Sequence, residues 1–387
     1  MRRLVALAMP AGAAFAAALR RCWEDDDAVL PLDMRLSQAA LDRIVEVLRP
    51  SAVLAPAGTL VALQGEPVED GDALVVATSG TTGMPKGVVL THAAVEASAR
   101  ATSARLGVDP SRDRWLACLP LSHVGGLSVV TRAIVTGTPV EIQSHFDAAE
   151  AKRAAAERGA TLVSLVPAAL SALGPEAAAM FRVIVLGGQA APDMRPANTV
   201  ATYGMTETGS GVVYDGLALD GVEVRVDSGE VQLRCPMLLR CYRDGTDPKT
   251  ADGWFPTGDA GALDEAGQLQ ILGRRDDVVI SGGENIWPAQ VEAVLRAHPG
   301  VADVAVGGVP DPLWGTRLVA YVVASPPGEA VGAADLLAEL RELVKELLAP
   351  YAAPRELVVV AKLPRSAIGK VDRAGLAALN GPRALAG

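Results

Sequence analysis

Short runs of aliphatic and β-branched residues alternate with alanine-rich segments over the first two-thirds of the chain. The runs have the length and composition of buried strands, and the segments between them repeat apolar residues at helical spacing. The predicted strands lie at 52–54, 74–76, 114–119, 139–142, 161–165 and 182–186, and the predicted helices at 37–48, 92–106 and 148–158. Alternation of this kind predicts parallel β-sheets covered by helices.

The pattern changes after about residue 215. Short strands separated by turns predict a small antiparallel or barrel-like section, at 222–226, 230–234 and 268–272. The expected fold is therefore α/β, with a large N-terminal domain at 1–274 that holds stacked parallel sheets, helices and this section.

A small α+β domain is expected at 275–387, joined to the first domain by a hinge. It should contain a hairpin, then helices at 288–297 and 333–348 and strands at 301–306, 318–323 and 357–360. On the longer helix one face carries apolar residues at helical spacing and is expected to be core: Leu336, Leu340, Leu343, Val344 and Leu347.

The N-terminus combines a positive start, Met1-Arg2-Arg3, with an apolar stretch from Leu4 to Leu19. This is the outline of a signal peptide, but Pro10-Ala11-Gly12 interrupts the stretch and Arg20-Arg21 follows it at once. The stretch is also too short to cross a bilayer as a helix. We therefore expect an amphipathic or buried alanine-rich helix, and a cytoplasmic protein without stable membrane insertion.

The composition narrows the class of protein. The 387 residues are 50% hydrophobic and carry a formal net charge of −10, which excludes a disordered chain and makes nucleic acid an unexpected partner. The four cysteines, Cys22, Cys118, Cys235 and Cys241, show no C-x-x-C spacing. This favours a reducing compartment over a disulfide framework or a zinc site.

The most informative loop follows the strand at 74–76 and is rich in hydroxyl groups and glycine. It reads Thr78-Ser79-Gly80-Thr81-Thr82-Gly83, and then Pro85-Lys86-Gly87. Glycines allow backbone N–H groups to approach an anion, while the hydroxyls and Lys86 add donors and a positive charge, so the loop suits a polyphosphate. It is not a Walker-type loop, because Lys86 is followed by glycine rather than by serine or threonine. The alternative is a flexible surface linker.

This loop resembles the phosphate-binding signature of the adenylate-forming superfamily, and further signatures follow in order. Tyr203-Gly204-Met205-Thr206-Glu207 resembles the segment in which tyrosine stacks on adenine, threonine binds the α-phosphate and glutamate helps to hold magnesium. Asp259 matches the aspartate that accepts both ribose hydroxyls. The resemblance implies ATP and Mg²⁺ as cofactors, with coenzyme A as co-substrate.

Each of the remaining signatures, taken alone, is weaker evidence for the resemblance. Gly188, Gln189 and Ala190 match the loop against adenine, and Arg274 matches a ribose contact. The resemblance further assigns Asp276 to the hinge, and Gly282 and Gly283 to the loop that lines the pantetheine tunnel. Lys370 matches the catalytic lysine that bridges the acid's carboxylate and the α-phosphate. Only 77 residues precede the phosphate loop, fewer than in most of the family, so we expect a trimmed first subdomain.

The shortened N-terminal region and the segments 203–216, 353–357 and 368–373 narrow the resemblance within the superfamily. With them the chain resembles the compact o-succinylbenzoate–CoA ligases of actinobacterial type, which act in menaquinone synthesis. Their reaction consumes o-succinylbenzoate, ATP and coenzyme A and releases AMP and pyrophosphate. Donors for the second carboxylate of this dianion are expected from His123, Ser164, Thr208 and Ser210, and no arginine is obviously placed for it.

Three alternatives stay open at the level of sequence. The chain could be another aryl- or acyl-CoA ligase, an enzyme that loads a carrier protein, or a non-catalytic nucleotide-binding protein. A homodimer is also left open. The joint presence of Lys86, Glu207, Asp259 and Lys370 argues against the non-catalytic alternative.

Overall fold

A computed structural model describes residues 2–56, 58–79, 84–189, 191, 194–325, 333–365 and 371–379 of the chain. Its internal contacts divide the chain into two compact units. The first comprises Met1–Arg225, Gln232–Pro256 and Leu263–Leu269, and the second comprises Val226–Val231, Thr257–Ala262 and Gln270–Gly387. The boundary predicted between residues 274 and 275 stays a prediction, because compactness by itself does not identify a hinge.

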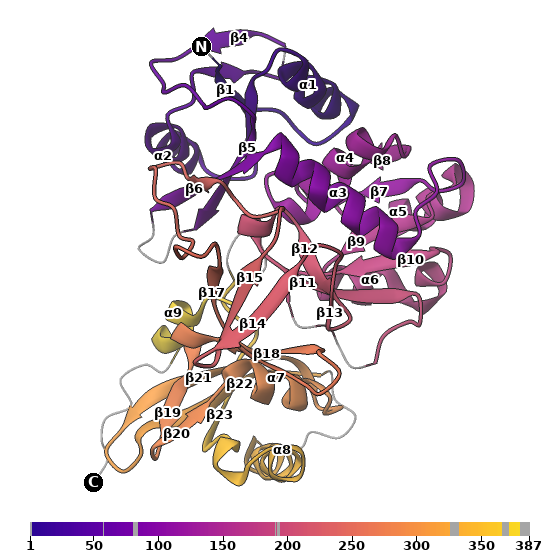
Figure 1. The fold of residues 1–387 in the computed structure, drawn as a ribbon. Coiled ribbons are helices and arrows are strands. Elements are labelled where there is room, and N and C mark those ends of the chain that lie inside the picture. The colour runs from indigo at the N-terminus through magenta and orange to yellow at the C-terminus, as the bar shows by residue number, and fades with distance from the viewer. Residues whose placement is uncertain are drawn as a thin grey trace. The chain divides into compact units, whose positions relative to one another are not determined.

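The first sheet of the N-terminal unit is parallel at its centre and antiparallel at its ends (Figure 1). Its strand order is β16-β6-β5-β2-β1-β3-β4, and β1, β2, β3 and β5 run parallel. The strands are β1 Leu4–Leu7, β2 Ala28–Pro31, β3 Ala52–Leu54, β4 Leu60–Ala62, β5 Asp72–Ser79, β6 Pro85–Thr91 and β16 Cys241–Tyr242.

The second sheet is parallel except at one end. Its order is β13-β12-β11-β10-β9-β7-β8, with β12 and β13 antiparallel and the other neighbours parallel. The strands are β7 Trp115–Ala117, β8 Val140–Ile142, β9 Leu162–Leu165, β10 Val183–Leu186, β11 Thr199–Gly204, β12 Gly211–Tyr214 and β13 Leu217–Ala218. The predicted α/β class is confirmed, with mixed rather than purely parallel sheets.

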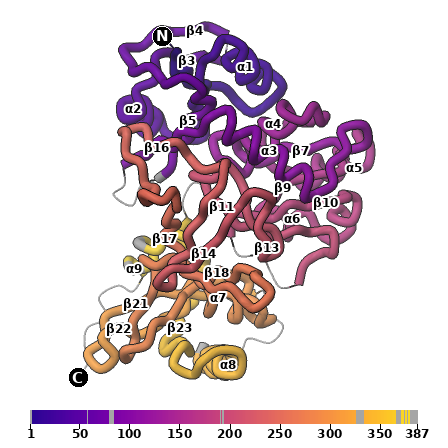
Figure 2. Tube along the Cα trace, viewed as in Figure 1, coloured from indigo at the N-terminus to yellow at the C-terminus, as the bar shows by residue number. Residues whose placement is uncertain are grey.

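Among the described residues of this unit, six helices lie in three layers around the two sheets. They are α1 Ala13–Glu24, α2 Gln38–Leu48, α3 His92–Leu106, α4 Val124–Thr136, α5 Ala148–Arg158 and α6 Pro167–Ala178. Side chains of α1, α3 and α4 share one core with both sheets, whereas α2 covers the outer face of the first sheet and α5 and α6 cover the second. Figure 2 shows α1 and α2 at the indigo end of the chain, where they pack on different faces of the first sheet.

Alternation along single strands produces these layers. In β9, Leu162 joins the core shared with α3 and α4, while Val163 and Leu165 face α5 and α6. In β10, Val185 and Leu186 divide in the same way. Successive side chains of a strand point to opposite faces, so a strand covered on both sides is apolar throughout.

The predicted helices at 92–106 and 148–158 are confirmed to the residue because their ends carry strong signals. Thr91 and Asp147 accept hydrogen bonds from the backbone N–H groups of Ala94 (3.1 Å) and Glu150 (2.8 Å). Gly159 ends the second of these helices with φ +71°, a left-handed conformation that suits glycine.

The single helix expected over the apolar N-terminal stretch is wrong. Leu4–Leu7 forms β1 in the middle of the first sheet, where it pairs with both β2 and β3, and α1 starts only at Ala13. Pro10 and Gly12 end the strand segment before the helix begins. Both faces of β1 are buried, so four apolar residues in a row did not reveal the strand period.

Strands β14 Glu223–Asp227, β15 Glu230–Arg234, β17 Phe255–Leu263 and β18 Leu269–Arg274 form a four-stranded sheet in that order. It occupies the stretch where a small separate section was predicted. The division into units passes through these strands, as the bounds of the two units show.

The rest of the second unit is a three-stranded sheet, β21-β22-β23, with helices on both faces. The elements are β19 Val279–Ser281, β20 Glu284–Ile286, α7 Pro288–Arg296, β21 Val301–Asp311, β22 Gly315–Ala324, α8 Ala333–Leu347, β23 Glu356–Val359 and α9 Arg373–Ala378. On α8, Leu336, Leu340 and Val344 are buried as predicted. Leu347 is 59% exposed, because Leu348 beyond the helix end takes the place against the core.

Within the described residues, no helix has both the length and the apolar character that crossing a membrane requires.

Candidate active site

The predicted phosphate loop connects the antiparallel strands β5 and β6. Thr78 pairs with Lys86 and Ser79 with Pro85, so both ends of the loop are held by the sheet. The Thr78 hydroxyl lies 3.4 Å from the Lys86 carbonyl oxygen. Gly80, Thr81, Thr82 and Gly83 lie outside the described residues, and their contact with phosphate stays a prediction.

The Tyr203–Glu207 segment begins on β11 and ends in the 3-10 turn Thr206–Thr208. A β-bulge between Tyr203 and Gly204 turns the chain out of the sheet. A Cβ atom at Gly204 would lie 2.2 Å from the carbonyl oxygen of Ser210, so only glycine fits there.

The Thr208 hydroxyl holds the turn that carries Thr206 and Glu207. It accepts from the Met205 N–H at 3.0 Å and lies 2.7 Å from the Ser210 carbonyl oxygen, and the side chain is fully buried. This geometry gives Thr208 a structural role in the turn. Its predicted contact with the acid remains a prediction.

Glu207 is fixed by a residue that the sequence did not single out. The hydroxyl of Tyr242 donates to Glu207 Oε1 at 3.0 Å, and the Leu239 N–H donates to the Glu207 carbonyl oxygen at 2.7 Å. The Lys86 ammonium lies 5.1 Å from the centre of the Tyr242 ring. Tyr242 thus joins the predicted metal ligand and the predicted phosphate ligand.

The residues present suit a magnesium ion that arrives with ATP. Within the described chain, no three His, Cys, Asp or Glu side chains gather into a group that could hold a metal alone. Mg²⁺ bound to a nucleotide keeps several waters and phosphate oxygens and needs one or two protein carboxylates. Glu207, held by Tyr242 at one oxygen, is the carboxylate predicted for this role, and its contact with the metal stays a prediction.

The loop after β10 has the conformation expected of a glycine turn. Gly188 has φ +83°, and both Gly188 and Gln189 are exposed. Ala190 lies outside the described residues. The adenine contact of this loop stays a prediction.

His123 occupies the N-cap position of α4 without a side-chain capping bond, and it faces an acidic side chain just beyond the end of the central strand β2. Its Nε2 lies 3.7 Å from Asp33 Oδ2. Hydrogen bonds from Arg35, with a smaller contribution from His123, lower the pKa of Asp33 to about 2, so this carboxylate is ionised at neutral pH. The structure therefore shows His123 beside an anion. The negative charge of Asp33 would repel a substrate carboxylate at this position.

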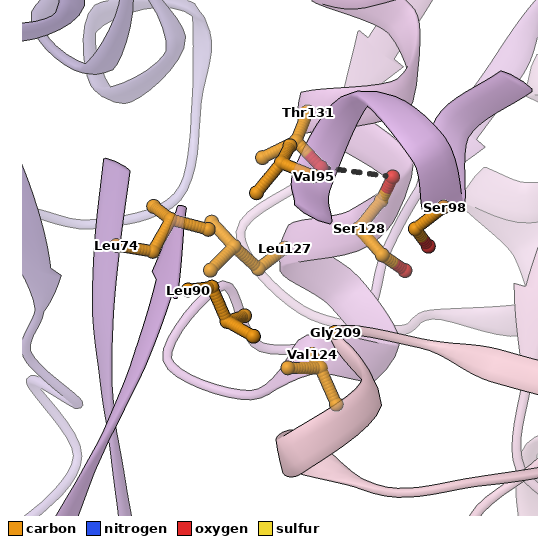
Figure 3. A pocket seen from close by; sticks show the side chains of 9 residues that line it. All are labelled: Leu74, Leu90, Val95, Ser98, Val124, Leu127, Ser128, Thr131 and Gly209. Carbon is orange, nitrogen blue, oxygen red and sulfur yellow. Dashed lines mark hydrogen bonds between the residues drawn. The ribbon is translucent and has the colours of Figure 1, made fainter. Parts of the chain in front are cut away.

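Ser210 faces the layer of α3 and α4. Its hydroxyl lies 2.7 Å from that of Ser98, which lines a small cavity with Ser128, Thr131 and Gly209 (Figure 3). The other lining residues are aliphatic: Leu74, Leu90, Val95, Val124 and Leu127. The cavity measures about 10 Å³, so an aromatic acid would enter only if side chains moved.

Ser164, also predicted to meet the acid, is buried on β9. By strand alternation it shares the face of Leu162, which packs toward α3 and α4. It is thus directed to the same layer as Ser210.

Arg132 on α4 is a buried cation that the sequence did not reveal. It is 2% exposed, stacks on the Trp115 ring at 4.9 Å, and burial lowers the pKa of its guanidinium. Within the described residues, its Nε and Nη1 atoms have no hydrogen-bond partner. Ser128, one turn earlier on the same face of the helix, lines the cavity of Figure 3. A buried arginine with unsatisfied donors is costly unless an anion meets it.

In the second unit, the two predicted ribose contacts lie together. Arg274 Nη1 donates to Asp259 Oδ1 at 3.2 Å and to the Thr257 carbonyl oxygen at 2.9 Å. Gly258 has φ +72°, and a Cβ atom there would lie 2.8 Å from the Arg274 guanidinium. Glycine at position 258 therefore leaves room for the Arg274 guanidinium to pair with Asp259.

The predicted hinge residue, Asp276, lies in the 3-10 turn Arg275–Asp277. Gly282 and Gly283 form the β19–β20 turn with φ +61° and +87°, and a Cβ atom at Gly282 would lie 2.9 Å from the Trp314 ring. Lys370 lies outside the described residues. Its catalytic role, the hinge and the tunnel contact all stay predictions.

Comparison with known proteins assigns the chain to a family. The model of the AMP-binding enzyme family matches residues 64–234, and that of the AMP-binding enzyme C-terminal domain matches residues 290–370. The probable 2-succinylbenzoate–CoA ligase of Mycobacterium tuberculosis is 42% identical, over 87% of this chain and 93% of the relative. The chain belongs to the AMP-binding enzyme family.

This AMP-binding enzyme is 37% identical to the 2-succinylbenzoate–CoA ligase of Listeria monocytogenes, over 78% of its own length and 68% of the relative's. Its fold matches that of o-succinylbenzoate CoA synthetase from Bacillus subtilis in complex with the acyl-adenylate intermediate, with TM-score 0.83 and 30% identity over 97% of this chain and 88% of that one. The same synthetase in complex with ATP and magnesium ion gives TM-score 0.82. The predicted family and fold class are confirmed.

Proposed function

We propose that this enzyme joins o-succinylbenzoate to coenzyme A at the expense of ATP, releasing AMP and pyrophosphate, in menaquinone biosynthesis. The observation that carries the proposal is the 42% identity with a probable ligase for this acid along nearly the whole length of both chains. The acid–thiol ligase class and the use of ATP, Mg²⁺ and coenzyme A agree with this relative and with the Bacillus subtilis synthetase.

In the first half-reaction, a carboxylate oxygen of the acid attacks the α-phosphorus of ATP, and the bond to the bridging oxygen of pyrophosphate breaks. We assign the β- and γ-phosphates to Lys86 and the loop that precedes it, and the α-phosphate to Thr206. Such a displacement depends on alignment and on stabilisation of the negative charge that builds up. Lys370 is assigned to the oxygens where that charge develops.

The nucleoside is assigned to aromatic and carboxylate side chains. Tyr203 stacks on adenine, and Asp259, oriented by Arg274, accepts the ribose hydroxyls. Glu207 holds Mg²⁺, which neutralises phosphate charge when bound.

In the second half-reaction, the sulfur of coenzyme A attacks the acyl carbon and AMP leaves with the former carboxylate oxygen. The proposal keeps Asp276 as hinge and the Gly282-Gly283 turn as a pantetheine contact. One cleft then performs two reactions through a change in domain arrangement.

The acid is a dianion, and its second carboxylate needs a positive partner. Arg132 supplies one: it is buried, its Nε and Nη1 are unsatisfied within the described residues, and it lies one helical turn from the cavity wall at Ser128. A guanidinium can bind a carboxylate with two parallel hydrogen bonds. The proposal thus assigns the second carboxylate to an arginine, for which inspection of the sequence had offered no obvious candidate.

A screen of pyrophosphate release tests the acid. We expect release with o-succinylbenzoate, and much less with benzoate and with 4-oxo-4-phenylbutanoate, which lacks the aromatic carboxylate. Activity with another acid while o-succinylbenzoate is inert would overturn the proposal. Transfer only to carrier-protein pantetheine, and not to coenzyme A, would favour the carrier-loading alternative.

The cysteines of the protein should react slowly with the thiol reagent used to measure coenzyme A consumption. Burial raises the pKa of Cys22 and Cys235 to about 11 and that of Cys118 to about 12, so these groups stay neutral at about pH 8, and the thiolate is the nucleophile. We expect slow labelling of all three in the native protein. Denaturant should expose all four cysteines, and rapid labelling of Cys118 without denaturant would contradict the burial seen here.

A further inference from the structure

Tyr242 belongs to none of the predicted signatures, yet it contacts two residues that do. Its hydroxyl donates to Glu207 Oε1 at 3.0 Å, and its ring lies below the Lys86 ammonium at 5.1 Å. Glu207 and Lys86 are separated by more than a hundred residues in the chain. Tyr242 is the bridge between them.

The backbone around Tyr242 is held firmly enough for this task. Strand β16 pairs with β6, which carries Lys86, so that Tyr242 lies opposite Val88. The Tyr242 N–H donates to the Thr246 carbonyl oxygen at 2.8 Å, and its own carbonyl accepts from Gly245 at 2.9 Å. Because the Leu239 N–H also binds the Glu207 carbonyl oxygen, one short segment holds both the backbone and the side chain of Glu207.

Tyr242 also borders open space next to Lys86. Tyr242 and Lys86 both line a cavity of about 140 Å³, together with Asp244. A cation over an aromatic face is attracted by the ring's quadrupole. The ring therefore gives the flexible Lys86 side chain a defined position before any phosphate arrives.

We propose that Tyr242 is a positioning residue for MgATP: its hydroxyl orients the Glu207 carboxylate toward the metal, and its ring pre-positions Lys86 for the phosphates. This inference rests on the proposed function. A hydrogen bond to one carboxylate oxygen restricts rotation of the group, which is how outer partners of a metal ligand raise its affinity. The two contacts use different parts of the side chain, so Tyr242→Phe removes the hydroxyl contact alone and Tyr242→Leu removes both.

The test compares Tyr242→Phe with Tyr242→Leu by equilibrium binding of ATP at increasing Mg²⁺, without acid or coenzyme A. Tyr242→Phe keeps the ring and loses the hydroxyl, so we expect about tenfold more Mg²⁺ for half-maximal binding, with metal-free ATP binding unchanged. Tyr242→Leu should weaken metal-free binding as well, since Lys86 loses its ring. Pyrophosphate-release kinetics should show a raised KM for MgATP and an unchanged KM for the acid.

Trp23→Phe is the matched control, because it removes one side-chain hydrogen bond of similar length, from Trp23 Nε1 to the Ala73 carbonyl oxygen at 3.0 Å, away from these residues. It should leave the Mg²⁺ titration unchanged, and thermal unfolding checks that each variant is folded. If Tyr242→Phe gave the same Mg²⁺ titration as the wild-type enzyme, or weakened ATP binding equally with and without Mg²⁺, the inference about Tyr242 would be overturned and the proposed function would not be affected. Failure of the wild-type enzyme to bind MgATP would instead overturn the proposed function.

Discussion

Replacement of Lys370 by alanine should slow acyl-adenylate formation by roughly 100- to 1,000-fold, the range found when one donor to a developing negative charge is removed. The lysine is assigned to the oxygens that gain charge as the acid attacks the α-phosphorus. It has no such task when a thiol displaces AMP. Thioester formation from preformed acyl-adenylate should therefore fall much less.

Two separate assays measure the effect: pyrophosphate release for the first half-reaction, and coenzyme A consumption with synthetic acyl-adenylate for the second. Lys362→Ala is the matched control, since Lys362 is an exposed lysine of the same unit with no assigned role. It should leave both rates unchanged. Equal losses of both half-reactions in Lys370→Ala would contradict the separation of roles.

Replacement of Arg132 by methionine should raise the activation free energy that kcat/KM reports for o-succinylbenzoate by about 3–5 kcal/mol, the cost of leaving a buried charge without its partner. That corresponds to a loss of roughly 100-fold or more. Acids without the second carboxylate should be used as well as before, or better. The enzyme's preference would then move from dianionic to monoanionic acids.

The same substitution should stabilise the ligand-free protein. Arg132 is 2% exposed, and two of its nitrogen atoms lack hydrogen-bond partners within the described residues, so an apolar side chain of similar length removes a desolvation cost. Thermal unfolding without ligand should therefore show a higher midpoint while activity with the dianion falls. Arg100→Met, at an exposed position of α3, is the control and should change neither. A lower midpoint, or equal losses with both kinds of acid, would contradict the assignment.

Much of the secondary structure could be predicted because local signals and tertiary packing agree. Helix α3 begins after the capping Thr91 and ends before Gly107, and its bounds follow from these two residues. Local signals failed at Leu4–Leu7, where burial on both faces removes the alternation that marks a strand. They failed again at Leu347, because periodicity alone does not say where a core ends.

For the candidate site, the sequence alone determined the chemical class through a resemblance. Its ordered motifs are a phosphate loop, an aromatic and carboxylate segment, and a ribose aspartate, and together they resemble the signatures of the adenylate-forming superfamily, whereas the phosphate loop by itself indicated only polyphosphate binding. The tertiary structure alone decided which other side chains support it. Tyr242 meets Glu207 from 35 residues away, and Arg132 is significant only because it is buried. Contacts across sheets and the loss of solvent are properties of the packed chain, and no local pattern of residues encodes them.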